Sequence, residues 1–148
     1  MNRPTIAVMG TFDTKAEEYQ YIIDKIHQLG ADTLTIDVST RDTASLRGVY
    51  GCREIAQYAG STYELLTNGT RAESMAIIMD GATKLVHQLL LEKRIHGIVS
   101  IGGSGGTTLA THVMRTLPIG FPKVIATTQA CSDKLPGFIS GKDIIVIN

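Results

Sequence analysis

Short apolar runs alternate along this chain with segments that have helical periodicity, and this alternation constrains the fold more than any other feature. Buried strands are predicted at residues 5–9, 33–38, 97–101, 123–127 and 143–147. Crossover helices are predicted over residues 16–29 and 75–90, and from the glycines near 105 to about 117. Such alternation is typical of a mostly parallel sheet with helices on both faces. We therefore expect a Rossmann-like, doubly wound α/β fold with five strands.

The order of the strands follows from the handedness of parallel connections. Residues 39–69 lose the regular pattern apart from a short helix expected around 53–58, and such a length favours a lid or an interface over a simple turn. With right-handed crossovers, this excursion returns the chain to the far side of the first strand and gives the order 2-1-3-4-5. Ligands bind in such sheets at the switch point beyond the carboxyl ends of strands one and three.

Two loops rich in glycine and threonine follow those two strands. The first contains Gly10, Thr11, Asp13, Thr14 and Lys15, and the second reads Gly102-Gly103-Ser104-Gly105-Gly106-Thr107. Four glycines in five residues let backbone N–H groups approach an anion, and the following helix adds its positive dipole end. The pattern favours phosphate binding, with a tight turn without ligand as the alternative. Asp13 and Thr14 could equally be helix caps, and Thr14 with Glu17 has capping-box spacing.

Two further residues are candidates for the same site. Asp37, near the end of the second strand, stands where related folds hold a ribose, although a turn-capping role fits it as well. Thr127 leaves the fourth strand toward the same edge. Neither the Walker A motif nor GxGxxG is present. The pattern identifies no catalytic residue and no cluster of metal ligands.

Composition narrows the class of protein. Fourteen basic residues balance fourteen acidic ones, so no nucleic-acid partner is expected. The apolar runs are too short for a membrane span, and the two cysteines lack the spacing of a metal site or a disulfide scaffold. We expect a cytoplasmic protein with one domain over residues 1–148. Because a doubly wound domain rarely ends on a bare strand, we also expect this chain to be the amino-terminal part of a longer protein.

Several segments resemble a known family. Residues 6–19, with Gly10-Thr11-Phe12-Asp13-Thr14-Lys15, look like the opening motif of proteins related to the amino-terminal, ATP-binding domain of the tomato mosaic virus resistance protein. Residues 102–107, 117–120 and 122–123 resemble the second hallmark of this family. Asp37 and residues 142–144 also match its pattern. The resemblance extends along essentially the whole chain, whereas residues 127–133 depart from the usual family sequence.

The resemblance implies a nucleotide-binding domain with ATP as its ligand, and it places nucleotide contacts in the two loops. Our own reading of the residues adds Mg²⁺ as a companion ion, and Asp13 would hold either Mg²⁺ or a ribose hydroxyl. It also implies a two-lobed protein of which this chain is the first half, lacking the C-terminal half, and we expect a homodimer. Two alternatives remain open: part of an enzyme acting on a phosphorylated or carboxylated small metabolite, and a non-catalytic interaction module that uses nucleotide structurally.

Overall fold

A five-stranded parallel sheet forms the centre of the protein in the computed structural model, which describes residues 3–148. The strands are β1 (Thr5–Gly10), β2 (Asp32–Asp37), β3 (Gly97–Gly102), β4 (Lys123–Thr127) and β5 (Ile145–Ile147). Their order is β2-β1-β3-β4-β5, which confirms the predicted topology. Alternate side chains of β1 enter opposite faces of the sheet, so Ala7 and Met9 pack in one core cluster and Val8 in another.

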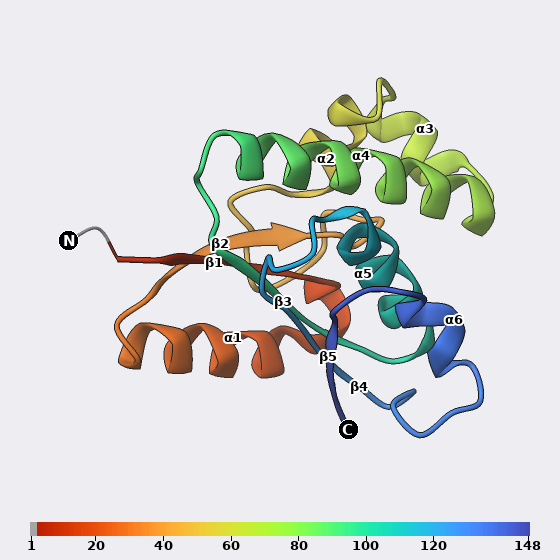
Figure 1. Ribbon diagram of the computed structural model, residues 1–148. Helices are drawn as coiled ribbons and strands as arrows, with labels where there is room; N and C mark the ends of the chain where they lie inside the picture. Colours follow the sequence, from red (N-terminus) through yellow and green to blue (C-terminus); the bar gives the residue numbers. More distant parts are fainter. Residues whose placement is uncertain (1–2) are drawn as a thin grey trace.

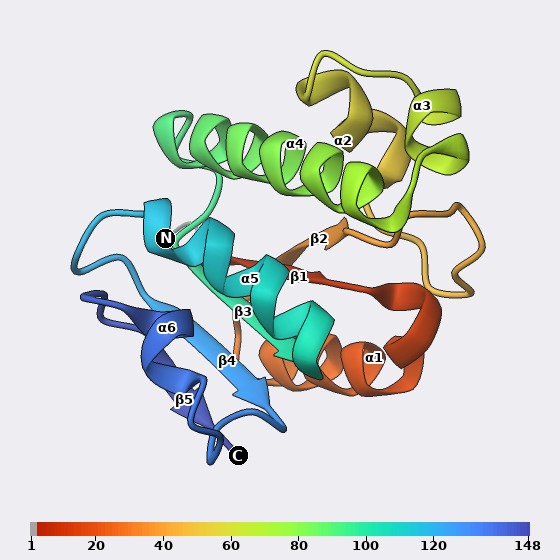
Figure 2. The ribbon, with the colours of Figure 1, turned by 90° about the vertical axis from the view of Figure 1, so that its right-hand side faces the viewer.

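Helices cover the two faces unequally. Helix α1 (Phe12–Gln28) lies on one face, whereas α4 (Arg71–Leu91) and α5 (Ser104–Thr116) lie on the other (Figure 1). The larger core cluster joins α4 and α5 to the sheet, and the smaller one joins Tyr19 and Ile23 of α1 to Val8. No described helix covers the α1-side face of β5, where Ile145 and Ile147 are exposed (Figure 2).

The excursion between β2 and α4 contains more regular structure than its sequence pattern predicts. Helix α2 (Cys52–Tyr58) confirms the expected short helix, and α3 (Tyr63–Asn68) is an additional one. Both pack along α4 (Figure 1). Gly81 of α4 permits the approach, because a Cβ at this position would lie 2.0 Å from the Ile55 carbonyl oxygen. Packing on α4 therefore stabilises two short helices, of which α3 has too short a sequence to be predicted from its pattern.

One expected helix boundary differs from the structure, and two others agree with it. Helix α1 begins at Phe12 with Thr11 as N-cap, so the capping box expected from Thr14 and Glu17 is wrong. Its backbone kinks at Lys15, and Gly30 ends it with a φ of +83° as expected. The second capping box is confirmed, because Thr70 and Glu73 bond reciprocally at the start of α4.

The chain's last elements also differ in part from the expectation. Helix α6 (Leu135–Ile139) occupies a segment expected to be a loop. Strand β5 begins at Ile145, because Asp143 turns away to pair with the buried Lys123 ammonium at 2.7 Å. Lys123 also donates to two backbone carbonyl oxygens, so each of the three N–H groups of its buried ammonium has an acceptor. Among the described residues, no helix combines the length and the apolar character that a membrane span needs.

Candidate functional site

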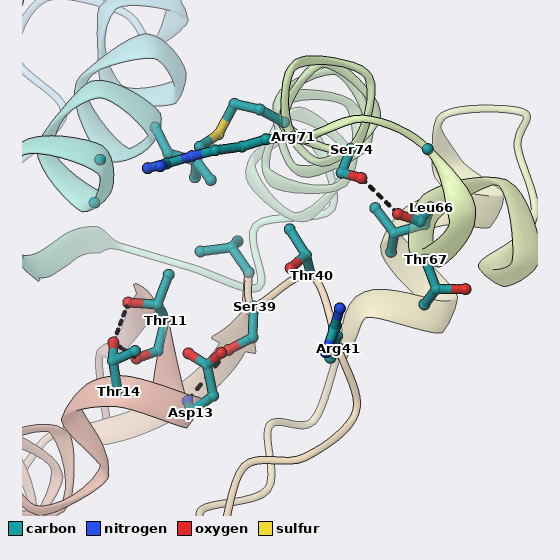
Figure 3. Close-up of a pocket in the computed structure, with 16 residues that line it drawn as sticks. Thr11, Asp13, Thr14, Ser39, Thr40, Arg41, Leu66, Thr67, Arg71 and Ser74 are labelled. Carbon is teal, nitrogen blue, oxygen red and sulfur yellow. Dashed lines mark hydrogen bonds between the residues drawn. The ribbon is translucent and has the colours of Figure 1, made fainter.

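A pocket of about 470 Å³ opens at the carboxyl edge of the sheet, where the loops after β1 and β3 meet. Its volume falls within the range of small-molecule sites in proteins, ~300–1,000 Å³. Helices α1, α4 and α5 all begin beside it (Figure 3). The lining residues are Thr11, Asp13, Thr14, Val38, Ser39, Thr40, Arg41, Leu66, Thr67, Gly69, Arg71, Ser74, Met75, Gly105, Gly106 and Leu109. The pocket therefore lies at the expected switch point.

The loop after β1 brings three of its candidate residues to the pocket. The hydroxyl groups of Thr11 and Thr14 are hydrogen-bonded at 3.0 Å, and the backbone N–H of Asp13 donates to Ser39 Oγ at 3.2 Å (Figure 3). Lys15 does not line the pocket, and its ammonium lies 3.7 Å from the carboxylate of Glu18. Two residues with hydroxyl groups and one with a carboxylate therefore line the pocket from this segment.

Gly10 supports the fold rather than the pocket. A Cβ at Gly10 would lie 1.6 Å from the hydroxyl oxygen of Tyr19, which is fully buried. That hydroxyl donates to the Ile101 carbonyl at 2.6 Å and accepts from the Ile101 N–H at 2.9 Å. Burial raises the pKa of Tyr19, so the phenol stays protonated and ties α1 to β3. Gly10 is required because this bridge passes directly over β1.

Asp37 caps the start of α1 from the neighbouring strand. Its Oδ1 accepts hydrogen bonds from the backbone N–H of Phe12 at 3.1 Å, the N–H of Ser39 at 3.0 Å and the Ser39 hydroxyl at 2.5 Å. Burial is the main cause that raises the pKa of Asp37, against the lowering effect of these donors. Asp37 lies outside the pocket lining, in the turn-capping arrangement that its sequence position allows.

The loop after β3 contributes glycine backbone to the pocket. Gly105 and Gly106 line it in the first turn of α5, while Gly102, Gly103 and Ser104 lie outside the lining. Thr107 and Thr127 are buried beneath this turn, and their hydroxyl groups are hydrogen-bonded to each other at 2.5 Å. These two hydroxyls therefore join α5 to β4 and do not face the pocket. Helix α5 has no side-chain N-cap bond and no acidic residue in its first turn.

The glycines of this loop differ in whether the packing around them leaves room for a side chain. A Cβ at Gly102 would lie 2.6 Å from the Thr107 backbone nitrogen, so packing excludes a larger residue. A Cβ at Gly103 would meet nothing within 4 Å, and at Gly105 or Gly106 the nearest atom would be 3.7 Å away. None of these three has a positive φ. The chain's own packing thus explains Gly102 but not the other three.

Several lining residues were not identified from the sequence pattern. Arg71 and Ser74 come from the first turn of α4, and Ser39, Thr40 and Arg41 from the loop after β2. A usable signal existed for α4, because a crossover helix runs antiparallel to its strands and starts at their carboxyl edge. The Thr70–Glu73 capping box marks this start. The loop after β2 has no comparable signal.

A family model and the relatives in a comparison with known proteins agree on one protein family. A model described as the N-terminal domain of an uncharacterised protein family, UPF0261, matches residues 4–148. A UPF0261 protein of Clostridium tetani is 40% identical over 148 residues, which cover 99% of this chain and 36% of that protein. A UPF0261 protein of Brucella suis is 35% identical over 147 residues, covering 99% and 35%.

A more distant relative comes from a plant. The ToMV resistance protein Tm-1(GCR237) of Solanum lycopersicum is 25% identical over 165 residues, which cover 98% of this chain and 21% of that protein. This confirms the resemblance that the two loop motifs indicate. The chain spans about a third of the length of the UPF0261 proteins that it matches. With the family model extending over residues 4–148, the chain belongs to the UPF0261 family, as its N-terminal domain.

Proposed function

We propose that this domain binds ATP or a related nucleotide in the pocket at the carboxyl edge of the sheet. The phosphates would lie on the Gly102–Thr107 loop at the start of α5, facing Thr11 and Thr14 across the pocket. The rest of the nucleotide would extend between the loop after β2 and the start of α4. The likeness to an ATP-binding family, stated above from the two loop motifs, supports adenosine nucleotides as the first ligands to test.

The glycines at the start of α5 carry this proposal. Glycine in a helix is less favourable than alanine by about 0.8–1 kcal/mol per residue. Glycine is nevertheless present at positions 105 and 106, although a Cβ would fit at both and neither residue has a positive φ. Both line the pocket. A ligand that approaches the backbone closely explains why side chains are absent there.

The electrostatics of the pocket favour an anion. Arg41 and Arg71 line it, against a single acidic residue, Asp13. The first turn of α5 contributes unpaired backbone N–H groups and the positive end of the helix dipole, with no acidic side chain of its own to balance them. Phosphate oxygens satisfy both the N–H groups and the arginines.

In this proposal, Asp13 would assist a magnesium ion. Mg²⁺ usually binds to one or two carboxylates together with water and the phosphates of a substrate. Among residues 3–148, no group of three or more His, Cys, Asp and Glu side chains could hold a metal ion. Asp13 is the one carboxylate in the pocket lining, so it fits a magnesium ion that is held by a single carboxylate together with water and phosphates. In this proposal it would hold Mg²⁺ that arrives with the phosphates.

Thermal unfolding with and without Mg²⁺ and ATP tests the proposal. A ligand at a hundred times its Kd stabilises the folded state by about 2.7 kcal/mol, a shift of roughly 5–10 °C for a domain of this size. The Gly105→Val variant fills the space between α5 and Arg71 and should lose this shift. Gly137→Val is the matched control, because Gly137 also has room for a Cβ but lies in α6, outside the pocket lining.

The outcomes separate the proposal from a turn without ligand. A shift in the wild type and in Gly137→Val, together with its loss in Gly105→Val, supports nucleotide binding at the start of α5. Equal shifts in all three proteins would place the nucleotide elsewhere. The absence of any shift in the wild type, checked by calorimetric titration, would contradict the proposal for this domain.

A further inference from the structure

Arg71 lies where two helices begin. It is the first residue of α4, after the N-cap Thr70, and its side chain extends toward the start of α5 (Figure 3). Its Nη2 is 3.7 Å from the position that a Cβ would take on Gly105. Helix N-termini carry partial positive charge, so a guanidinium at this place is repelled by both helices. The fold therefore keeps a cation where its own electrostatics disfavour one.

No residue of the described chain neutralises this cation. Within residues 3–148, Arg71 has neither a hydrogen bond nor an ion pair, and the same holds for Arg3 and Arg41, whereas the other four arginines each have a hydrogen-bond partner. Glu73, two residues further along the same helix, is engaged elsewhere, because its carboxylate accepts from the Thr70 N–H at 2.7 Å. Asp13 comes from the first turn of α1, across the pocket in Figure 3.

The unmatched charge faces the glycine turn from the opposite helix. Gly105 and Gly106 supply backbone on one side, and Arg71 supplies a planar guanidinium on the other. An anion bound beside both groups would receive N–H groups from α5 and a two-pronged contact from the arginine. The arginine's fork matches the oxygen spacing of a phosphate, while a lysine would offer only a point charge.

We propose that Arg71 makes the pocket selective for ligands that carry a phosphate chain, by gripping phosphate oxygens seated on the first turn of α5. This inference rests on the proposed function for the location of the phosphates. It does not depend on which chemical group is attached to the phosphate chain. A nucleoside triphosphate and a free polyphosphate share the chemistry that Arg71 recognises. An uncharged nucleoside lacks it.

Calorimetric titration with ATP, tripolyphosphate and adenosine tests this role. The proteins are the wild type, Arg71→Met, Arg71→Lys and Arg3→Met. The Arg3 variant removes the same charge outside this pocket, beside the start of β1. Arg71→Met should weaken ATP and tripolyphosphate by about 10- to 100-fold, as expected for the loss of charge-assisted hydrogen bonds. Arg71→Lys should recover part of this loss, and Arg3→Met should change neither affinity by more than about threefold.

The ligands distinguish failure of this inference from failure of the proposed function. Binding of tripolyphosphate but not ATP, with loss in Arg71→Met, would refute the nucleotide and keep the phosphate-chain role of Arg71. Binding of both with equal affinities in Arg71→Met and the wild type would refute the role of Arg71 and keep the nucleotide. A loss in Arg71→Met that also weakens adenosine equally would show a structural effect instead. If the wild type binds neither phosphate ligand, both proposals are wrong.

Discussion

Helices α1 and α5 begin at the same edge of the sheet, yet their starts are completed differently. The start of α1 is closed by the protein itself, because Asp37 accepts from the Phe12 N–H and Gly10 makes room for Tyr19. The start of α5 has no side-chain cap, no acidic residue, and glycines for which packing gives no reason. The difference teaches that of two similar glycine-threonine motifs, one can have its helix start closed by the fold while its neighbour leaves the helix start open, which is where we propose that a ligand binds.

The largest effect should come from Gly10→Ala. The new methyl group would lie 1.6 Å from the hydroxyl oxygen of buried Tyr19, which cannot move without breaking its bonds to Ile101. We expect a loss of about 3 kcal/mol in the free energy of unfolding, measured by urea denaturation. Gly103→Ala is the control, because its Cβ meets nothing within 4 Å. Similar losses in both variants would break the distinction between the loops.

Asp37→Ala should produce the next largest effect. It removes the acceptor for the Phe12 and Ser39 N–H groups, and losing such a cap costs about 2 kcal/mol at a buried site. Urea denaturation measures the loss, and Asp37→Asn, which keeps an acceptor oxygen, should lose less. If Asp37→Ala instead kept full stability and failed to bind ATP, Asp37 would contact the ligand, and the start of α1 would resemble that of α5.

Gly105→Ala should have a smaller effect, with opposite signs for stability and binding. Alanine has the higher helix propensity and fits beside Arg71, so stability should rise by about 0.5 kcal/mol. The methyl group also occupies space next to the pocket lining, so ATP affinity should fall. Denaturation and calorimetric titration on the same samples measure both quantities. A gain in stability without any loss of ATP affinity would favour a turn that has no ligand.

The smallest effect concerns the pH dependence of the α1 cap. Burial raises the pKa of Asp37 above its unfolded value of about 3.9. The folded state then binds its proton more tightly than the unfolded state. The contribution of this proton to the free energy of unfolding is complete below pH about 4, and it is lost as the pH rises through the folded-state pKa of Asp37. Relative to Asp37→Asn, the wild type should therefore lose stability between acid and neutral pH. A relative gain would show that the three donors outweigh burial.

Much of the fold could be predicted because its signals are local. Strands such as β1 contain a continuous apolar run, residues 6–9, and the handedness of parallel crossovers then orders all five strands. Helices α3 and α6, with six and five residues, are too short to produce a periodic pattern. The start of α1 was misplaced because its cap, Asp37, comes from another strand. A cap supplied across the sheet has no sequence spacing to identify it.

The candidate site was only partly accessible from the sequence. By itself the sequence determined that two glycine-threonine loops follow neighbouring strands, because strand order depends on local pattern and chain handedness. Only the tertiary structure decided which members face the pocket, placing Gly105 and Gly106 in its lining and Thr107 with Thr127 beneath it. It also brought Arg71 beside Gly105. The physical reason is that such contacts depend on how α4 packs across the sheet, which is set by the core as a whole.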